Sequence, residues 1–437
     1  MPIKPVPALV ALLLLGLLGC VTNPITGERQ FNIVSQDSLL SLSKQAVPEQ
    51  FAADYGVLAD RSLNTYVQRV GQRLLATLKP ADMVYANMPF SFQVVNATYV
   101  NAYAFPDGSI AITRGMLLEL ENEAQLAAVL GHEIAHVNCG HTASAMSKGS
   151  VLEMVISGTG SYLQARESSW TEIATLAGQV GGKAMLARYS REQERQADQG
   201  GMDYMVRAGY NPRGMIGLMK LLVRLGHENP SLLEQMFATH PMSTERLASA
   251  TARVQSHYAG TQGEDGATGY GAAMASLRAS KTAIHAFARA ESQLAGKQSA
   301  AALQTVRQGL TLLPNDAAGL LIMAEALAAS GQLAPARQAA TAALQTASAL
   351  RAESMLVQCA LQQKDYASAL QHLNKLESRG SSDARIAFFK GVAYEGLNRK
   401  AEAVASYNQY LARSPAAGAE GTYARQHLQQ LAPPPAQ

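Results

Sequence analysis

The sequence predicts an N-terminal domain of the α+β class, mostly helical with a small sheet, followed by an all-α region. Two observations carry this prediction. Short stretches that alternate apolar and polar residues lie in the first third of the chain, among helices with an apolar period of 3.6 residues. Beyond residue 285, similar helix starts recur about every 34 residues, a period typical of stacked helix pairs.

Length and composition narrow the functional class. The chain has 437 residues, enough for two or three domains with buried cores. Its formal net charge of +3 and the lack of a dense basic run argue against nucleic-acid binding. Cys139 and Cys359 fall in different predicted domains, each in an apolar helical setting, so we expect buried free thiols and no disulfide.

Residues 1–19 are predicted to be a signal peptide. Their apolar run, 8–18, is too short to span a bilayer and ends in Leu-Leu-Gly before Cys20. This ending resembles a bacterial lipobox, which implies a lipid anchor on Cys20; an ordinary signal peptide with a chance cysteine is the alternative. Because Val21 is not aspartate, the enterobacterial sorting rule implies the outer membrane, with the protein facing the periplasm.

Helical periodicity and β-rich alternation give the elements of the first part in order. A turn signal at 105–108 joins two alternating stretches, so residues 101–113 are predicted to form a β-hairpin. We expect strands at 30–34, 90–95 and 109–113, and helices at 36–44, 63–78 and 183–208. A further helix is expected to begin near residue 121.

The helix that begins near residue 121 carries a candidate metal site. His132, Glu133 and His136 form a His-Glu-x-x-His sequence, in which the two histidines lie one turn apart on the same face. Such a pair binds one Zn²⁺, with the glutamate beside it. Two exposed histidines on a surface helix are the alternative. An apolar side favours the zinc site, since one face of the helix would be buried by Leu126, Ala127, Val129, Leu130, Ile134 and Val137.

A third ligand is expected from the helix at 183–208. Glu194 and Asp198 stand at i and i+4, so one carboxylate can bind metal while the other accepts the N–H of a ligand histidine. A solvated charged helix is the alternative. The metzincin pattern is excluded, because its third histidine would stand at Thr142. His141 is expected to lie about 140° around the helix from His136, facing away from the metal.

These motifs together resemble the gluzincin zinc metallopeptidases related to the CAAX prenyl protease. Thr239-His240-Pro241 followed by Arg246 is similar to the family's His-Pro-x-x-x-x-Arg element, and the resemblance covers 22–254. It implies a zincin-like metallopeptidase domain with one zinc ion per chain. Gln196 departs from the pattern, since a second acidic residue is expected there, but this position is not a ligand. The implied ligands are His132, His136 and Glu194, with Asp198 behind them.

The resemblance also implies the catalytic roles. Glu133 is expected to act as general base, with His240 and Arg246 as partners of the developing oxyanion. For His240 a second role stays open: it binds zinc as a fourth ligand and holds the enzyme latent. A cleft beside an edge strand would hold an extended peptide by main-chain hydrogen bonds. The candidate edge is Asn101, Ala102, Tyr103 and Ala104, and a buried inner strand is the alternative.

The last third contains an internal repeat. Equivalent turn-plus-helix starts end at Ala301, Ala336, Ala369 and Ala403. Their spacing resembles tetratricopeptide repeats, which implies an all-α solenoid that binds peptides or a partner protein. The expected domains are a signal peptide at 1–19, a metallopeptidase domain at 20–255, a linker at 256–285, repeats at 286–420 and a tail at 421–437.

The combination resembles the group of beta-barrel assembly-enhancing proteases. It implies a lipid-anchored periplasmic zinc endopeptidase that cleaves misfolded or stalled outer-membrane proteins, with the repeats contacting substrate or the barrel-assembly machinery. The alternative is a chaperone-like scaffold or adaptor whose metal site stays plugged. Retention of Glu133 favours the enzyme, because a scaffold has no need of a general base.

Overall fold

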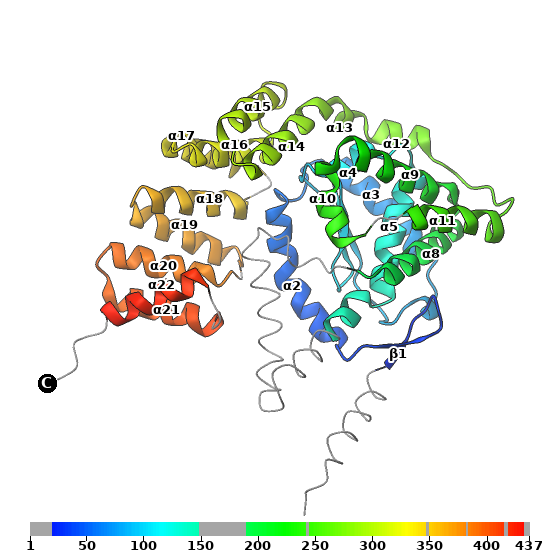
Figure 1. Ribbon diagram of the computed structural model, residues 1–437, viewed down its shortest axis with the longest axis horizontal. Coiled ribbons are helices and arrows are strands. Elements are labelled where there is room, and N and C mark those ends of the chain that lie inside the picture. The colour runs from blue at the N-terminus through cyan, green and yellow to red at the C-terminus, as the bar shows by residue number, and fades with distance from the viewer. Residues whose placement is uncertain are drawn as a thin grey trace, which may run out of the picture.

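The computed structural model describes residues 20–147, 189–241, 244–346, 349–381, 383–414 and 418–431. It contains an α+β part with a small sheet and a row of paired helices, as predicted (Figure 1). The predicted signal peptide lies outside the described residues. Within the described part of the chain, no helix has the length and apolar character needed to cross a membrane.

The α+β part begins with a short hairpin and is built around a three-stranded sheet. The sheet has the order β3-β5-β4, with β3 parallel to β5 and β4 antiparallel to it. The predicted hairpin is therefore confirmed as β4–β5, and Gly108 in its turn has a φ of +89°, which favours glycine. The elements are β1 (Cys20–Thr22), β2 (Arg29–Phe31), α2 (Gln36–Ala53), α3 (Arg61–Leu75), the 3₁₀ helix η1 (Pro80–Asp82), β3 (Ser91–Val95), β4 (Ala102–Ala104) and β5 (Ser109–Thr113).

The remaining helices of this part enclose a central helix, α5. Helices α3, α8 and α9 and strand β4 all pack against α5, so residues 124–138 are buried throughout. The prediction that only one side of this helix is buried was therefore wrong, because neighbours cover the helix all round. The helices are α4 (Arg114–Glu119), α5 (Glu123–Asn138), α8 (Arg191–Arg207), α9 (Arg213–Glu228), α10 (Pro230–Thr239) and α11 (Thr244–His257).

The predicted linker at 256–285 is instead packed structure. It contains α12 (Ala267–Ala273), α13 (Ala275–Ala279) and the start of α14 (Lys281–Ala295). Tyr270 is fully buried in the core of the α+β part, and its hydroxyl donates a 2.6 Å hydrogen bond to the carbonyl of Leu117. The glycine-rich composition suggested a flexible segment, but this aromatic anchor and the apolar residues around it fix the segment on α4 and α5.

The C-terminal part is a row of helix pairs that curves beside the α+β part (Figure 1). The pairs are α14 with α15 (Ser299–Leu312), α16 (Ala317–Ala329) with α17 (Leu333–Ala343), α18 (Ala349–Gln362) with α19 (Tyr366–Ser378), and α20 (Arg385–Gly396) with α21 (Lys400–Arg413). The tail predicted from residue 421 was wrong in its first part. Helix α22 (Ala419–Leu431) packs on α21 and buries Ala424.

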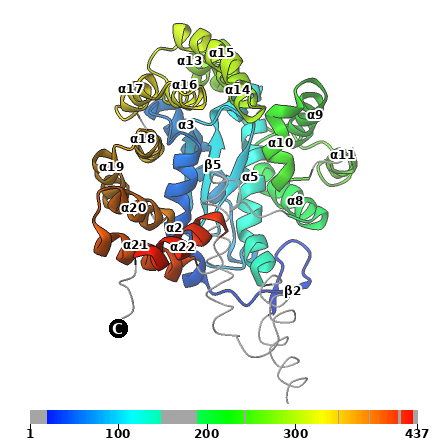
Figure 2. The same ribbon diagram turned by 60° about the vertical axis from the view of Figure 1, so that its left-hand side comes forward.

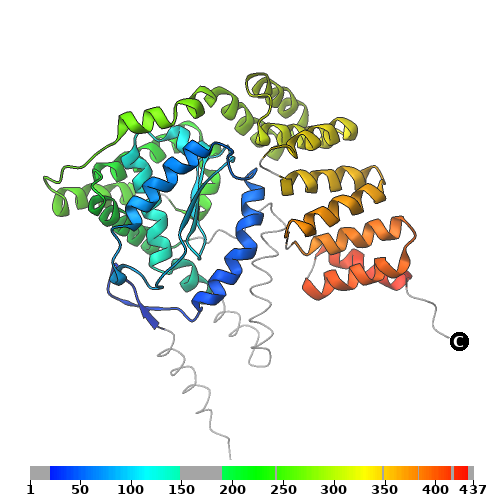
Figure 3. The same ribbon diagram turned by 180° about the vertical axis from the view of Figure 1, so that it is seen from behind.

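Helix α2 lies between the sheet and the helix pairs (Figures 2 and 3). Polar side chains also join the two parts. The guanidinium of Arg114, in the first turn of α4, pairs with the carboxylate of Asp316 at the start of α16. Glu291 of α14 accepts hydrogen bonds from the hydroxyls of Tyr55 and Thr98. Arg351 of α18 stacks over the Tyr55 ring at 4.0 Å. The helix pairs are thus fixed to the sheet side of the α+β part.

The cysteines agree with the prediction of unpaired thiols. Cys139 and Cys359 are buried and free, and Cys20 is half-buried at the start of β1. Burial raises the pKa of the Cys139 thiol to about 12, so this group stays protonated and packs as an apolar side chain.

Candidate metal centre

The centre begins with the two histidines of α5. Asn122 caps this helix by accepting a hydrogen bond from the backbone N–H of Gln125. In the last two turns of α5, His132 and His136 project from the same face, and their Nε2 atoms are 3.0 Å apart. Both side chains are buried.

Helix α8 brings the carboxylates to these histidines because it approaches α5 unusually closely. A Cβ on Gly201 would lie 2.8 Å from the backbone nitrogen of His132, and one on Gly131 would lie 3.0 Å from the carbonyl oxygen of Gly201. Two glycines at the crossing therefore allow the contact. One Glu194 oxygen lies 3.3 Å from Nε2 of His136 and the other lies 3.6 Å from Nε2 of His132.

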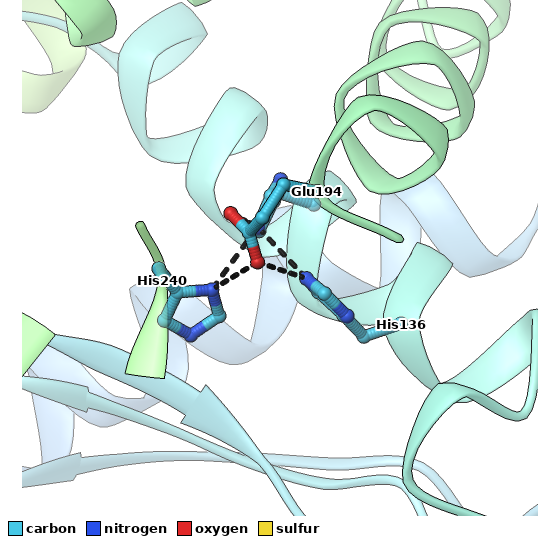
Figure 4. Close-up of side chains that lie close together, drawn as sticks. His136, Glu194 and His240 are labelled. Atoms are coloured by element: carbon cyan, nitrogen blue, oxygen red, sulfur yellow. Dashed lines mark hydrogen bonds and ion pairs between the residues drawn. The ribbon is translucent and has the colours of Figure 1, made fainter. Parts of the chain in front are cut away.

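His240 completes the group from the C-terminal end of α10. Its Nδ1 atom lies 3.1 Å from Oε1 of Glu194 and 3.4 Å from Nε2 of His132. Figure 4 shows His136, Glu194 and His240 converging, with strands of the sheet beneath them. Within the described residues, His132, His136, Glu194 and His240 offer ligand atoms that all lie within 4.8 Å of one another.

Asp198 and Arg246 lie behind the ligand atoms. Asp198 is one turn after Glu194, and its Oδ1 lies 2.9 Å from Nδ1 of His132. The Arg246 guanidinium binds both carboxylates: it donates to Asp198 at 2.8 and 2.7 Å, and its Nη1 lies 2.6 Å from Oε2 of Glu194. All these groups are buried. Arg246 therefore holds the two carboxylates of α8 in place.

The donor set and its spacing fit a zinc ion. A carboxylate only accepts hydrogen bonds, so Nδ1 of His132 carries a hydrogen toward Asp198, and in the neutral ring its Nε2 bears a lone pair. This lone pair faces nitrogen and oxygen acceptors at 3.0–3.6 Å, an arrangement that a cation stabilises. A tetrahedral Zn²⁺ with bonds of ~2.0–2.1 Å separates its ligand atoms by about 3.3 Å. Imidazole and carboxylate ligands are those that zinc takes in catalytic sites.

The charge states of the buried groups also suit metal binding. Burial lowers the pKa of His136 well below its ordinary value, so the neutral ring is available as a ligand. Burial opposes ionisation of Glu194, but His240 and His136 outweigh it and hold the pKa of that carboxyl well below its ordinary value. For Asp198, the Arg246 guanidinium likewise overcomes burial and lowers the pKa.

Glu133 stands apart from the ligand atoms. Its Oε1 lies 3.7 Å from Nε2 of His240, and within the described residues its buried Oε2 has no hydrogen-bond partner. Burial raises the pKa of this carboxyl, while His240 and His132 oppose the shift. A buried carboxylate with a free oxygen beside the cluster is suited to accept a proton from a bound molecule.

The predicted edge strand lies at the edge of the sheet. Strand β4 pairs only with β5 within the described sheet and packs against α5, the helix of the ligand histidines. Asn101, just before β4, is fully buried, and neither its side-chain oxygen nor its nitrogen has a hydrogen-bond partner among the described residues. Strand Ala102–Ala104 is therefore not an inner strand of the described sheet, although its residues are mostly buried.

His141 does not face away from the site as the sequence suggested. Helix α5 ends at Asn138, and Gly140 follows with a φ of +62°, so the chain turns and a helical angle no longer applies. Nδ1 of His141 lies 2.9 Å from Nδ1 of His136, and its Nε2 lies 2.9 Å from Oε1 of Gln196. His141 thus contacts the outer nitrogen of a candidate ligand and contributes no atom to the ligand cluster.

Two further residues of the centre were missed as site residues. The ring of Tyr189 stacks on His136, with centroids 3.7 Å apart, and Asn23 in the N-terminal hairpin contacts Gln196. Tyr189 falls inside the helix predicted over 183–208, whereas in the structure it precedes Ser190, the residue that caps the start of α8. For Asn23, no sequence pattern connects the hairpin with α8, because the contact spans 173 residues.

Comparison with known proteins supports this chemistry. Residues 61–254 match the family described as Peptidase family M48. The chain is 30% identical over 207 residues to the beta-barrel assembly-enhancing protease of Yersinia pestis, covering 47% of this chain and 41% of that protein. Identity to the Escherichia coli (strain K12) protein of the same name is 30% over 203 residues, 45% and 40% of the two chains. Metalloprotease YcaL of the same strain is 28% identical over 192 residues, which cover 43% of this chain and 71% of that protein.

The family match shows which part of the chain is similar to the known metalloproteases. This chain spans about two fifths of the length of the beta-barrel assembly-enhancing proteases reported above, and the helix pairs after residue 281 lie outside the family match. The matched residues include the His-Glu-x-x-His helix, Glu194 and His240, so the predicted relationship to zinc metallopeptidases is confirmed. Residues 61–254 are therefore similar to the zinc-dependent metallopeptidases of family M48.

Proposed function

We propose that this chain is a zinc metalloendopeptidase of the bacterial envelope that hydrolyses peptide bonds of misfolded or stalled outer-membrane proteins. The observation that carries the proposal is the convergence of His132, His136 and Glu194 beside a buried oxygen of Glu133 that no described residue contacts by a hydrogen bond. The relatives named beta-barrel assembly-enhancing protease support the choice of substrate class.

His132, His136 and Glu194 would hold the zinc ion, which supplies a Lewis acid that polarises a carbonyl and lowers the pKa of water. Glu133 takes the proton from the attacking water and returns it to the leaving amine. Asp198 orients His132 through its Nδ1–H, and Arg246 neutralises both carboxylates of α8. Because its guanidinium is committed to Glu194 and Asp198, we assign Arg246 to positioning in place of the oxyanion contact suggested by the sequence.

His240 acts in this proposal as a latch. Its Nδ1 lies 3.1 Å from Oε1 of Glu194, and the ring offers a ligand atom within 4.8 Å of the other three, so His240 would hold the zinc as a fourth ligand in place of substrate or water. Burial opposes the charged form of His240, but the Glu194 and Glu133 carboxylates raise its pKa above the ordinary value. Opening requires the His240 ring to move away from the other three ligand side chains, which leaves room for water and a substrate carbonyl.

Replacing His240 with alanine tests the latch. Removal of the fourth donor should raise the rate of peptide cleavage by roughly tenfold if the latch keeps about nine-tenths of the molecules closed. The measurement is cleavage of an unfolded protein at equal zinc content. Unchanged or lost activity would show that His240 is an oxyanion partner or a structural residue.

The peptide would bind along β4 in extended form. Its main chain would pair with the free edge of the strand, a mode that tolerates many sequences and suits damaged substrates. Asn101, directly before β4, would pair with that main chain, because both polar atoms of its amide lack a partner among the described residues. Ala102, Tyr103 and Ala104 form the edge itself.

A lipid on Cys20 would hold the protein on the outer membrane, facing the periplasm. Cys20 is the first residue of β1. Changing Cys20 to serine should move the protein from the membrane fraction to the soluble periplasmic fraction, as measured by cell fractionation. Retention in the membrane would contradict the lipid anchor.

The helix pairs of the C-terminal part are proposed to be tetratricopeptide repeats. The repeat spacing near 34 residues and the packing of α14 to α21 in successive pairs support this assignment. Their role would be to recruit substrate or the barrel-assembly machinery. The second candidate function, a latent adaptor, is favoured by one observation, the position of His240 in the ligand cluster.

Metal removal distinguishes the two functions. A chelator should abolish cleavage of an unfolded outer-membrane protein, and one equivalent of Zn²⁺ should restore it. The same treatment should also lower the free energy of unfolding, by about 4 kcal/mol if zinc is present at 1,000 times its Kd. Zinc binding without any metal-dependent cleavage would support the adaptor.

A further inference from the structure

The N-terminal hairpin reaches the metal centre through one buried side chain. Asn23 lies in the turn between β1 and β2 and is 2% exposed. Its Nδ2 donates a 2.8 Å hydrogen bond to Oε1 of Gln196 on α8. Gln196 lies two residues after the candidate ligand Glu194, so the hairpin packs directly behind the centre.

From Gln196 the contacts continue to a candidate zinc ligand. The same Oε1 atom lies 2.9 Å from Nε2 of His141, and Nδ1 of His141 lies 2.9 Å from Nδ1 of His136. All four side chains are buried, with His141 fully enclosed. We call Asn23, Gln196, His141 and His136 the relay.

Asn23, the relay residue farthest from the zinc site, determines which atom donates in each hydrogen bond of the relay. Oδ1 of Asn23 accepts from the backbone N–H groups of Ile25 and Thr26, at 2.9 and 3.2 Å. The atom that faces Gln196 is therefore the amide nitrogen, a donor, and Gln196 must present its oxygen. The other end of the Gln196 amide agrees, because its Nε2 points to a Glu192 oxygen at 3.4 Å.

The tautomers of both histidines follow. The Gln196 oxygen cannot donate, so Nε2 of His141 carries the hydrogen, and in the neutral ring its Nδ1 is an acceptor. Nδ1 of His136 must then be the donor. This leaves Nε2 of His136 unprotonated, and it is this atom that faces His132 and Glu194.

We propose that Asn23, Gln196 and His141 are positioning residues of the metal centre, which hold His136 in the tautomer that binds zinc through Nε2. The N-terminal hairpin is thus a structural part of the centre. Asn23, three residues after Cys20, belongs to the group of side chains that orients the ligand His136. This inference rests on the proposed zinc site and gives Asn23, Gln196 and His141 a role in orienting one of its ligands.

Two isosteric substitutions test the relay. Asn23→Asp replaces the donor with an acceptor, so Gln196 must turn its amide nitrogen toward residue 23 and His141. Nε2 of His141 becomes an acceptor, its Nδ1 gains the hydrogen, and His136 is driven to the tautomer with hydrogen on Nε2. Zinc affinity, measured by competition with a chelator, should fall by about 10–100-fold. Gln196→Glu keeps an acceptor for both neighbours, so in the metal-free protein His136 should keep its hydrogen on Nδ1; hydrogen on Nε2 in this variant would contradict the relay.

A matched control separates the relay from a general effect of charge. Asn32 is 6% exposed, its Oδ1 accepts from the backbone of Val34, and its Nδ2 donates to the Tyr85 hydroxyl. Asn32→Asp therefore makes the same chemical change outside the relay and should leave zinc affinity within about twofold, a small fraction of the loss expected in the relay. The Tm of each metal-free protein shows whether a variant is folded.

The tautomer is also measurable without zinc. In the metal-free full chain, ¹⁵N chemical shifts should show hydrogen on Nδ1 of His136 in the wild type and on Nε2 in Asn23→Asp. Hydrogen on Nε2 in the wild type, or zinc affinity unchanged in Asn23→Asp, would overturn the relay. A wild-type protein with the expected tautomer but no zinc binding would contradict the proposed function and leave the relay supported.

Discussion

Replacing Glu133 with glutamine should abolish most of the peptidase activity while the protein still binds one zinc ion. The expected loss is about 10²–10⁴-fold in kcat, the contribution of a positioned general acid–base group. Zinc should remain because Glu133 lies outside the ligand cluster, and the isosteric amide keeps the packing of α5. The measurement compares zinc content and cleavage of an unfolded outer-membrane protein between the two proteins.

The control for this variant lies on α8. Glu192 is an exposed carboxylate that pairs with Arg195 and accepts a 3.4 Å contact from Gln196, so Glu192→Gln makes the same change of charge near the centre and keeps an oxygen for that contact. Its activity should stay within about twofold of the wild type, since exposed ion pairs contribute little. If Glu133→Gln cleaves as fast as the wild type, the general-base role is wrong. If neither protein cleaves while both bind zinc, the adaptor is favoured.

The parts of the centre that could be predicted from the sequence depend on local geometry. The spacing of His132 and His136 sets their relative positions once the segment is helical, and the same holds for Glu194 and Asp198. The β4–β5 hairpin was equally local, because its turn residues specify it. Each of these predictions required only one element and its period.

The predictions that were wrong concern residues at contacts between different elements. His141 was placed by extending a helix that in fact ends at Asn138. The segment at 256–285 looked like a linker by composition, but Tyr270 finds a buried site on α4, which no local pattern encodes. Asn23 likewise acquires its role only through tertiary contact with Gln196. Composition and periodicity describe single elements, whereas these outcomes depend on which surfaces meet in the folded chain.

Disrupting the Arg114–Asp316 pair should separate the helix pairs from the metallopeptidase domain. The two side chains are 2% and 7% exposed and make two contacts, at 2.5 and 2.9 Å. Arg114→Met leaves the buried Asp316 carboxylate without its cation, so the free energy of unfolding should fall by about 3–5 kcal/mol. Urea unfolding measures this loss. An exposed pair provides the comparison: Arg399→Ala, which removes the contact with Glu402, should cost less than about 1 kcal/mol.

A double variant shows whether the loss comes from the uncompensated charge. Asp316 also caps α16 by accepting from the N–H of Gly319, and asparagine keeps that cap while removing the charge. Arg114→Met with Asp316→Asn should therefore recover most of the stability. Arg114 begins α4, where a Cβ on the next residue, Gly115, would lie 2.3 Å from the carbonyl oxygen of Thr98. Loosening this contact should speed amide exchange in β4, because the chain after Thr98 leads into that strand. Wild-type exchange in a destabilised Arg114→Met protein would show that the helix pairs do not support the substrate edge.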